Sequence, residues 1–183
     1  MVLFWTDKGI EMTEATLDLA VKRGRDLGIE DFVLASSTGY TAKLLLEKGV
    51  KPVCVRYHAG FREPGCQVME EEVKAELEGR GVRILTTTHL MGGIDRGLEN
   101  KFSGCYPSGI VAHTLRMFGH GTKVALEIAV MALDAGLVPF GREIISIGGS
   151  GRGADTALVV VPSHAKTFFE GKIKEIICKP REL

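Results

Sequence analysis

A strand–helix–strand pattern in residues 32–57 most constrains the fold. Residues 32–35, Phe-Val-Leu-Ala, form a short apolar run typical of a buried strand. Residues 39–49 follow with apolar positions at helical spacing, and residues 52–57 form a second apolar run. Because such crossovers are right-handed, the pattern predicts two parallel strands with the helix packed on one face.

Three further apolar runs extend this pattern. Residues 82–85, 143–147 and 157–161 predict strands three to five. The last two are joined by too few residues for a crossover helix, so they must be antiparallel. We therefore expect one three-layer α/β/α domain over residues 1–183. Its sheet should have about five mostly parallel strands in the order 3-2-1-4-5, with the last strand antiparallel and at or near an edge.

Helical spacing accounts for most of the remaining chain. Gly28 and Gly136 are expected to end two of the helices in a left-handed conformation, and Pro107 suits a first turn. A short terminal strand could follow at residues 173–178, after a helical turn. The predicted helices other than 39–49 cover residues 13–28, 69–78, 94–102, 107–118 and 122–135.

The charge balance and the hydropathy pattern limit which classes of function are expected. Lys plus Arg and Asp plus Glu are equal at 23 each, so no net field would attract nucleic acid or an anionic membrane. The longest apolar stretch, residues 124–140, is interrupted by charges and a proline, and there is no secretion signal. We expect a cytoplasmic protein that binds a small molecule and contacts neither nucleic acid nor membrane. A homo-oligomer formed through apolar helix faces is left open, and the scarcity of Asn and Gln indicates a thermophilic source.

The cysteines and histidines do not predict a metal site. The four cysteines lack Cys-x-x-Cys spacing, and the five histidines lack the spacing of a zinc site. No Ser, His and Asp set identifies a nucleophile, so catalytic residues stay unknown. Three histidines, His58, His89 and His120, fall at the expected ligand edge, where a proton-handling role competes with an ordinary structural one.

The first candidate ligand loop, called here the serine loop, covers residues 36–41. It joins a strand to a helix, so its hydroxyls and the free N–H groups of the helix end can bind an anion such as phosphate. A plain capping role for Ser37 or Thr38 is the alternative. No Walker motif is present, which argues against ATP hydrolysis. The candidate residues are Ser36, Ser37, Thr38, Gly39, Tyr40 and Thr41.

The second candidate, the glycine loop, covers residues 148–156 and holds four glycines within six residues. We interpret this density as close backbone approach to a ligand. Arg152 could pair with a phosphate, and Asp155 suits hydroxyl or ring N–H groups; pairing of the two with each other is the alternative. Ligands of open α/β sheets lie where such loops gather. The candidate residues are Gly149, Ser150, Gly151, Arg152, Gly153, Ala154, Asp155 and Thr156.

A third candidate is the run Gly-His-Gly-Thr-Lys at residues 119–123, at the start of a long helix. The helix end and the neighbouring cation would suit an anion, although capping by Thr122 explains the run equally well. We add His58, His120, Thr122 and Lys123 to the binding candidates.

Two segments resemble the C-terminal domain of pyruvate kinase. These are residues 32–57, with Ala-Ser-Ser-Thr-Gly-Tyr-Thr-Ala, and residues 147–161, with Gly-Ser-Gly and Thr156. In that enzyme the matching loops hold the phosphates of a sugar effector. The barrel domain that performs its chemistry has no counterpart here, so the resemblance does not imply a pyruvate kinase. Arg152, Asp155 and the helical insert after His89 depart from its pattern and count against a bisphosphorylated sugar.

The whole chain is similar to a family of stand-alone, mostly archaeal proteins labelled as pyruvate kinase α/β domains. The shared traits are Ser-Ser-Thr-Gly-x-Thr, residues 118–123, and Gly-Gly-Ser-Gly-Arg-Gly-Ala-Asp-Thr. This resemblance implies flavin mononucleotide (FMN) binding with an unsettled cellular role. The serine loop would take the phosphate, and the glycine loop would run along the ribityl chain or ring. The alternatives are a non-catalytic sensor of a phosphorylated metabolite and an FMN-dependent oxidoreductase.

Overall fold

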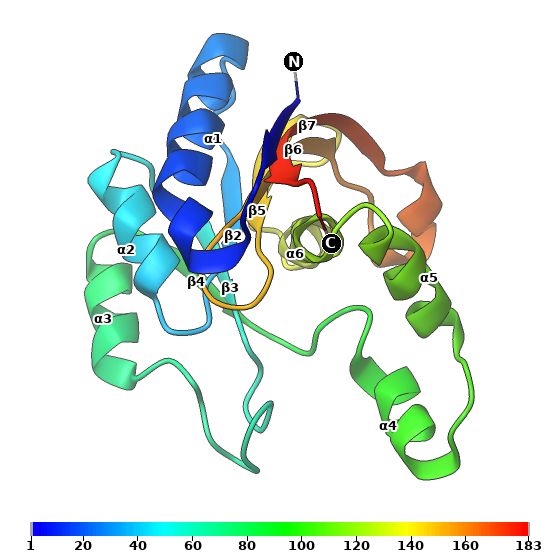
Figure 1. Cartoon of the computed structure of the whole chain (residues 1–183). Helices are drawn as coiled ribbons and strands as arrows, with labels where there is room; N and C mark the ends of the chain where they lie inside the picture. Colours follow the sequence, from blue (N-terminus) through cyan, green and yellow to red (C-terminus); the bar gives the residue numbers. More distant parts are fainter. Residues whose placement is uncertain (1, 183) are drawn as a thin grey trace.

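A seven-stranded mixed sheet organises the protein, as the computed structural model of residues 2–182 shows (Figure 1). Its strand order is β1-β7-β6-β5-β2-β3-β4. The strands are β1 (Leu3–Trp5), β2 (Phe32–Ala35), β3 (Val53–Arg56), β4 (Arg83–Thr86), β5 (Ile144–Gly148), β6 (Thr156–Val161) and β7 (Lys172–Pro180).

Only β6 runs against its neighbours. It is antiparallel to both β5 and β7, whereas β1–β7, β5–β2, β2–β3 and β3–β4 are parallel pairs. The sheet has seven strands rather than about five, so the strand count and the full strand order differ from the prediction. The predicted strands lie within the observed order as β4-β3-β2-β5-β6, but β7 and β1 extend the sheet, so β6 is not an edge strand.

The two added strands lie outside the predicted five, although β7 covers residues 173–178, where the sequence analysis left a short terminal strand open. β1 has three residues and is largely exposed, and β7 alternates lysine and glutamate with isoleucine. The pairing of β7 with β6 also has two register shifts, which break the regular alternation of side chains. A three-residue strand acquires its conformation from the partner it pairs with, which for β1 is the distant β7.

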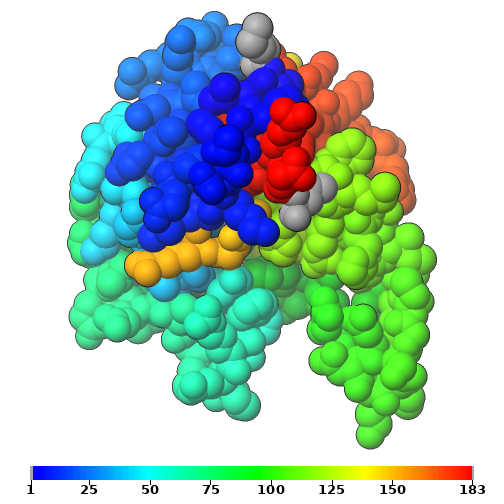
Figure 2. All heavy atoms as spheres, viewed as in Figure 1, coloured from blue at the N-terminus to red at the C-terminus, as the bar shows by residue number. Residues whose placement is uncertain are grey.

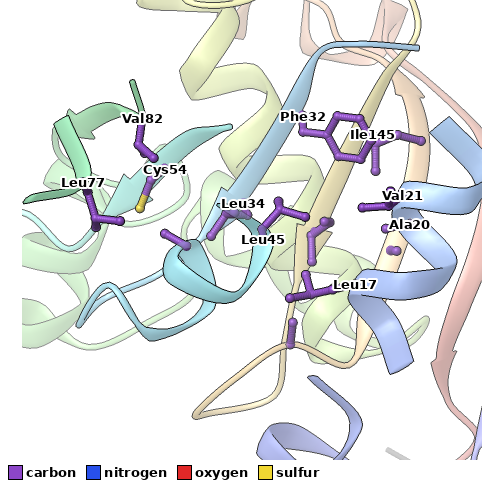
Figure 3. Packing of buried hydrophobic residues seen from close by; sticks show 14 of the residues in the cluster. Leu17, Ala20, Val21, Phe32, Leu34, Leu45, Cys54, Leu77, Val82 and Ile145 are labelled. Atoms are coloured by element: carbon purple, nitrogen blue, oxygen red, sulfur yellow. The ribbon is translucent and has the colours of Figure 1, made fainter. Parts of the chain in front are cut away.

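Helices cover both faces of the sheet. The side chains of Phe32 and Leu34 in β2 point to the face covered by α1 (Thr13–Leu27), α2 (Tyr40–Glu47) and α3 (Glu71–Gly79). Figure 3 shows this packing, with Leu17, Ala20 and Val21 of α1 close to Phe32 and Ile145. Val33 points to the opposite face, which α6 (His120–Asp134) covers, and α5 (Pro107–Arg116) packs on α6.

One helical segment departs from this compact body. No residue of α4 (Gly93–Phe102) is buried, whereas nearly all of α6 is. Together with the start of α5, α4 projects from the sheet-bearing part of the molecule, as the green spheres in Figure 2 show. No described helix combines the length and apolar character needed to cross a bilayer.

The predicted helices are present with shifted ends. α3 begins at Glu71 rather than residue 69, α6 begins at His120 rather than Thr122, and α5 ends at Arg116. Gly28 ends α1 with φ +66° and Gly136 follows α6 with φ +69°, both in the expected left-handed region. Two short 3-10 helices, η1 (Gly9–Met12) and η2 (Ala165–Glu170), complete the structure.

The start of α6 lies against the end of β5 without space for side chains. A Cβ atom on Gly148 would overlap the carbonyl oxygen of Gly121 and lie 2.9 Å from the backbone nitrogen of Ala125. A Cβ atom on Gly121 would in turn overlap Thr156. Glycine at both positions therefore brings the N-terminus of α6 to the carboxyl edge of the sheet.

We predict that Gly148→Ala lowers the free energy of unfolding by about 1–3 kcal/mol, because backbone atoms must move to accept the methyl group. Gly97→Ala in α4 is the control, since no atom lies within 4 Å of its Cβ position. It should be neutral or stabilising by up to about 1 kcal/mol, the helix-propensity difference. Urea denaturation measures both, and equal midpoints for the two variants would contradict the close approach.

Candidate functional site

The two candidate loops leave neighbouring parallel strands at the same edge of the sheet. The serine loop follows β2, and the glycine loop follows β5, which pairs with β2 on the side away from β3. From β2 the chain crosses through α2 to β3, while α6 leads into β5 on the opposite face. The strand order therefore reverses between β2 and β5, which is the ligand position of open α/β sheets.

The serine loop is anchored at its start and open at its tip. The backbone N–H of Ser36 donates to the carbonyl oxygen of Val55, 3.1 Å away, which fixes the loop to β3. Gly39 precedes α2 with φ +88°, and a Cβ atom there would lie 2.6 Å from Cγ1 of Val73 in α3. Ser36, Gly39 and Thr41 are buried, whereas Thr38 is exposed.

No side chain caps α2 among the described residues. The capping role considered for Ser37 and Thr38 is therefore absent, and the N–H groups of the first turn have no side-chain acceptor. These N–H groups and the exposed hydroxyl of Thr38 lie at the N-terminus of α2. Negative charge is favoured at this end of a helix.

Asp155 organises the glycine loop from inside the protein. Its Oδ2 accepts hydrogen bonds from the backbone N–H groups of Gly9 and Ser150, each 2.9 Å away, and its Oδ1 accepts one from the Thr156 hydroxyl. The indole N–H of Trp5 donates to the Asp155 carbonyl oxygen. Asp155 is fully buried, so its carboxylate shapes the loop, and the expected contact with ligand hydroxyls or ring N–H groups has no support in its placement.

The glycines of this loop are required mainly by internal packing, which corrects our interpretation of their density. A Cβ atom on Gly149 would lie 2.5 Å from the carbonyl oxygen of Gly153, and one on Gly153 would lie 2.7 Å from Cα of Ile10. Gly148 is similarly enclosed by α6. Only Gly151, with φ +92°, has open space around it. The close neighbours are residues of the N-terminal segment and α6, which the sequence pattern did not place beside the loop.

The serine and glycine loops meet through the exposed side chain of Arg152 and the half-buried ring of Tyr40. The guanidinium carbon of Arg152 lies 5.6 Å from the centroid of the Tyr40 ring, within the range of a cation–π interaction. Arg152 does not pair with Asp155, so the alternative of a mutual ion pair is wrong. The contact places a cation beside the serine loop.

A hollow lies on the other flank of the glycine loop. Its volume is about 410 Å³, enough for a small ligand. The first turn of α6 opens into it without a side-chain cap, because the Thr122 hydroxyl donates to the carbonyl oxygen of Phe118. The hollow is lined by Lys8, Gly119, His120, Ser150, Gly151, Pro180 and Glu182. Sequence reasoning missed Lys8 and Glu182, since nothing in their local pattern separates them from ordinary surface charges.

Lys123 does not reach the hollow as a free cation. It is buried and pairs with Glu127 one turn later in α6, and burial lowers its pKa. Glu127 also accepts a hydrogen bond from the backbone N–H of Met91, 2.7 Å away. The expected role of Lys123 beside a ligand phosphate is therefore unsupported, because its charge is already paired with Glu127 within α6.

Aromatic side chains gather after β3 and β4, further along the same edge. Tyr57 stacks on Phe61 with ring centroids 3.8 Å apart, and His89 lies within 6 Å of both rings and of His58. Burial is the main cause that lowers the pKa of His89. The same cause lowers the pKa of His120 beside the hollow. Burial therefore favours the neutral imidazole at both positions.

No group of three or more His, Cys, Asp and Glu side chains in residues 2–182 is arranged to hold a metal ion. Cys54 and Cys178 are buried in the core, and burial raises the pKa of Cys54 to about 12 and that of Cys178 to about 11. Their thiolates are therefore scarce at neutral pH.

We predict that Asp155→Ala lowers the free energy of unfolding by about 2–3 kcal/mol, because the buried N–H of Gly9 and the part-buried N–H of Ser150 lose their acceptor. Asp7→Ala, at an exposed position, is the control and should change it by less than about 0.5 kcal/mol. Urea denaturation gives both values. A loss no larger than that of the control would refute the organising role of Asp155.

Stability should also fall as the pH drops from 7.5 to 5.5. The folded pKa values of His89 and His120 lie below the ordinary 6.5, so the unfolded chain binds more protons in this window. We predict that the His89→Gln, His120→Gln double variant loses less stability over this range than the wild type. Urea midpoints at the two pH values measure the effect, and equal losses would contradict it.

No family model matches the sequence. The fold is similar to parts of solved pyruvate kinase structures from Cryptosporidium parvum. One is 16% identical, with TM-score 0.38 over 77% of this chain and 21% of that chain. The same enzyme in complex with ADP is 16% identical, with TM-score 0.41 over 84% of this chain and 24% of that chain. This chain thus spans about a quarter or less of the length of those enzymes.

Proposed function

We propose that this protein binds a phosphorylated small molecule, with FMN as the candidate ligand, at the carboxyl edge between β2 and β5. The observation that carries the proposal is the meeting of the serine and glycine loops at this position, where Arg152 lies over Tyr40. Both loops leave strand ends at the point where the strand order reverses.

The serine loop has the chemistry of a phosphate site. The first turn of α2 lacks a side-chain cap, and Thr38 presents an exposed hydroxyl beside it. The loop itself contains no carboxylate, and Arg152 adds a positive charge near Tyr40. A phosphate monoester would accept hydrogen bonds from these groups and gain from the helix dipole.

The remainder of an FMN molecule would lie along the tip of the glycine loop. Ser150 and Gly151 form this tip and line the hollow, and the open space at Gly151 permits close approach of a ribityl chain or ring. Burial lowers the pKa of His120 at the hollow, which favours a neutral imidazole beside the ring. Bound FMN would supply hydride or electron transfer if an oxidisable partner can reach it, so the oxidoreductase stays an alternative.

We predict that Thr38→Glu weakens FMN binding at least about tenfold, because the added carboxylate repels the phosphate dianion. Thr88→Glu, which adds the same charge to an exposed residue after β4, is the matched control and should bind like the wild type. Quenching of FMN fluorescence during titration measures the affinity. Equal affinities of the two variants would show that the phosphate does not bind at the serine loop.

Two further measurements separate the alternatives. Riboflavin lacks the phosphate, so Thr38→Glu should leave its affinity unchanged if the substitution acts on the phosphate alone. Thermal stabilisation by sugar phosphates without any FMN binding would replace FMN with a phosphorylated metabolite and favour the sensor. Bleaching of bound FMN by NADH or NADPH would favour the oxidoreductase.

A further inference from the structure

A polar row crosses the ends of three strands on the face covered by α2 and α3. Leu34 of β2 pairs with Cys54 of β3, and both side chains belong to the core beneath these helices. Two residues further along β3, Arg56 is on the same face and pairs with Thr86 of β4. On the β2 side of Arg56, the chain leaves β2 and enters the serine loop at Ser36. The N–H of Ser36 donates to the carbonyl oxygen of Val55, the residue before Arg56.

Arg56 is buried with its hydrogen bonding incomplete. Its side chain is only 7% exposed, and its Nε donates to the Thr86 hydroxyl at 2.6 Å. Its Nη1 is shielded from water and makes no hydrogen bond to any described residue. Because a guanidinium that leaves water without full hydrogen bonding costs free energy, this nitrogen marks a place for an additional acceptor.

The nearest carboxylate is a poor permanent partner for this nitrogen. Oε1 of Glu71 lies 3.5 Å from Nη1 without hydrogen-bond geometry, and the Glu71 side chain is 69% exposed. Glu71 is the first residue of α3, and no side chain caps this helix. Its other oxygen, Oε2, lies 4.0 Å from Nζ of Lys74, a second long ion pair. A largely exposed side chain with two weak contacts can rotate into water at little cost.

The serine loop and the first turns of α3 enclose the same corner. Gly39 packs so closely on Val73 of α3 that a Cβ atom would not fit between them. Glu71 precedes Val73 by two residues, and Arg56 lies beneath the first turn that both belong to. The buried guanidinium, the free N–H groups of this turn and the serine loop are thus parts of one local arrangement.

We propose that Arg56 is a phosphate-binding arginine at this corner, and that Glu71 holds its guanidinium only until an anion replaces it. The inference rests on the phosphate site proposed for the serine loop, and adds a specific cation and a competing carboxylate to it. The ligand class is a phosphate monoester dianion, whose oxygens match the donor geometry of a guanidinium. Binding moves the Glu71 carboxylate into water and gives Nη1 a hydrogen-bond acceptor.

Glu71→Gln tests this exchange without disturbing the core, because the side chain is exposed. We expect the variant to bind inorganic phosphate at least about threefold more tightly than the matched control Glu72→Gln, since only Glu71 contacts Arg56. Glu72→Gln measures the effect of removing one nearby negative charge. Titration at pH 8 and constant ionic strength, followed by phosphorus NMR, gives both affinities.

Arg56→Met removes the guanidinium that is proposed to bind phosphate. This variant should therefore bind phosphate at least about tenfold more weakly. Its thermal unfolding curve shows whether it is folded, and a folded Arg56→Met variant that binds phosphate like the wild type would overturn the proposal. Equal affinities of Glu71→Gln and Glu72→Gln would overturn it too, even if Arg56→Met failed to fold.

The outcomes also separate this inference from the proposed function. One outcome is a wild type that binds phosphate but not FMN, together with tighter phosphate binding by Glu71→Gln than by Glu72→Gln. This result would support Arg56 as the residue that binds phosphate and would exclude FMN as the ligand. FMN binding with no difference between Glu71→Gln and Glu72→Gln would support the proposed function and remove the role of Arg56. A wild type that binds neither ligand would overturn both.

Discussion

The buried carboxylate of Asp155 is the interaction on which the candidate site depends. It joins the glycine loop to the distant N-terminal segment, through the N–H of Gly9, and also bonds within its own loop to the N–H of Ser150 and the hydroxyl of Thr156. These hydrogen bonds hold the glycine loop against the N-terminal segment, and the position of the loop in turn places Arg152 over Tyr40. Without them, buried N–H groups would lack acceptors and the loop would lose its fixed shape.

Charge is used differently on the two faces of the sheet. Beneath α6, the buried charges of Lys123 and Glu127 neutralise each other, and Glu127 also accepts from the Met91 N–H. Beneath α3, the buried charge of Arg56 has a neutral partner in Thr86 and only a distant, exposed carboxylate in Glu71. The first arrangement is complete and structural. The second can accept a further anion, so the proposed phosphate site lies beside β2 and β3.

The sequence supported local predictions better than predictions of contact. The core strands, the six helices and the serine loop follow from apolar spacing and from glycines such as Gly28, and the structure contains them. Arg56 was missed because an arginine at the end of an apolar strand looks like a solvated terminus. The placement of Asp155 and Lys123 does not support the roles expected for them for a related reason, since residue type does not show whether a charge is already paired.

Local patterning alone determined the α/β class, the parallel arrangement of β2 and β3 and the presence of polar loops after β2 and β5, because helix and strand periodicities and crossover handedness act over short stretches of chain. The tertiary structure decided where the sheet ends, since β1 pairs with a strand more than 160 residues away in the chain. It also decided which polar groups are available to a ligand. Asp155 and Lys123 are satisfied by distant or buried partners, whereas the first turn of α2 and Nη1 of Arg56 are not, and only packing makes that distinction.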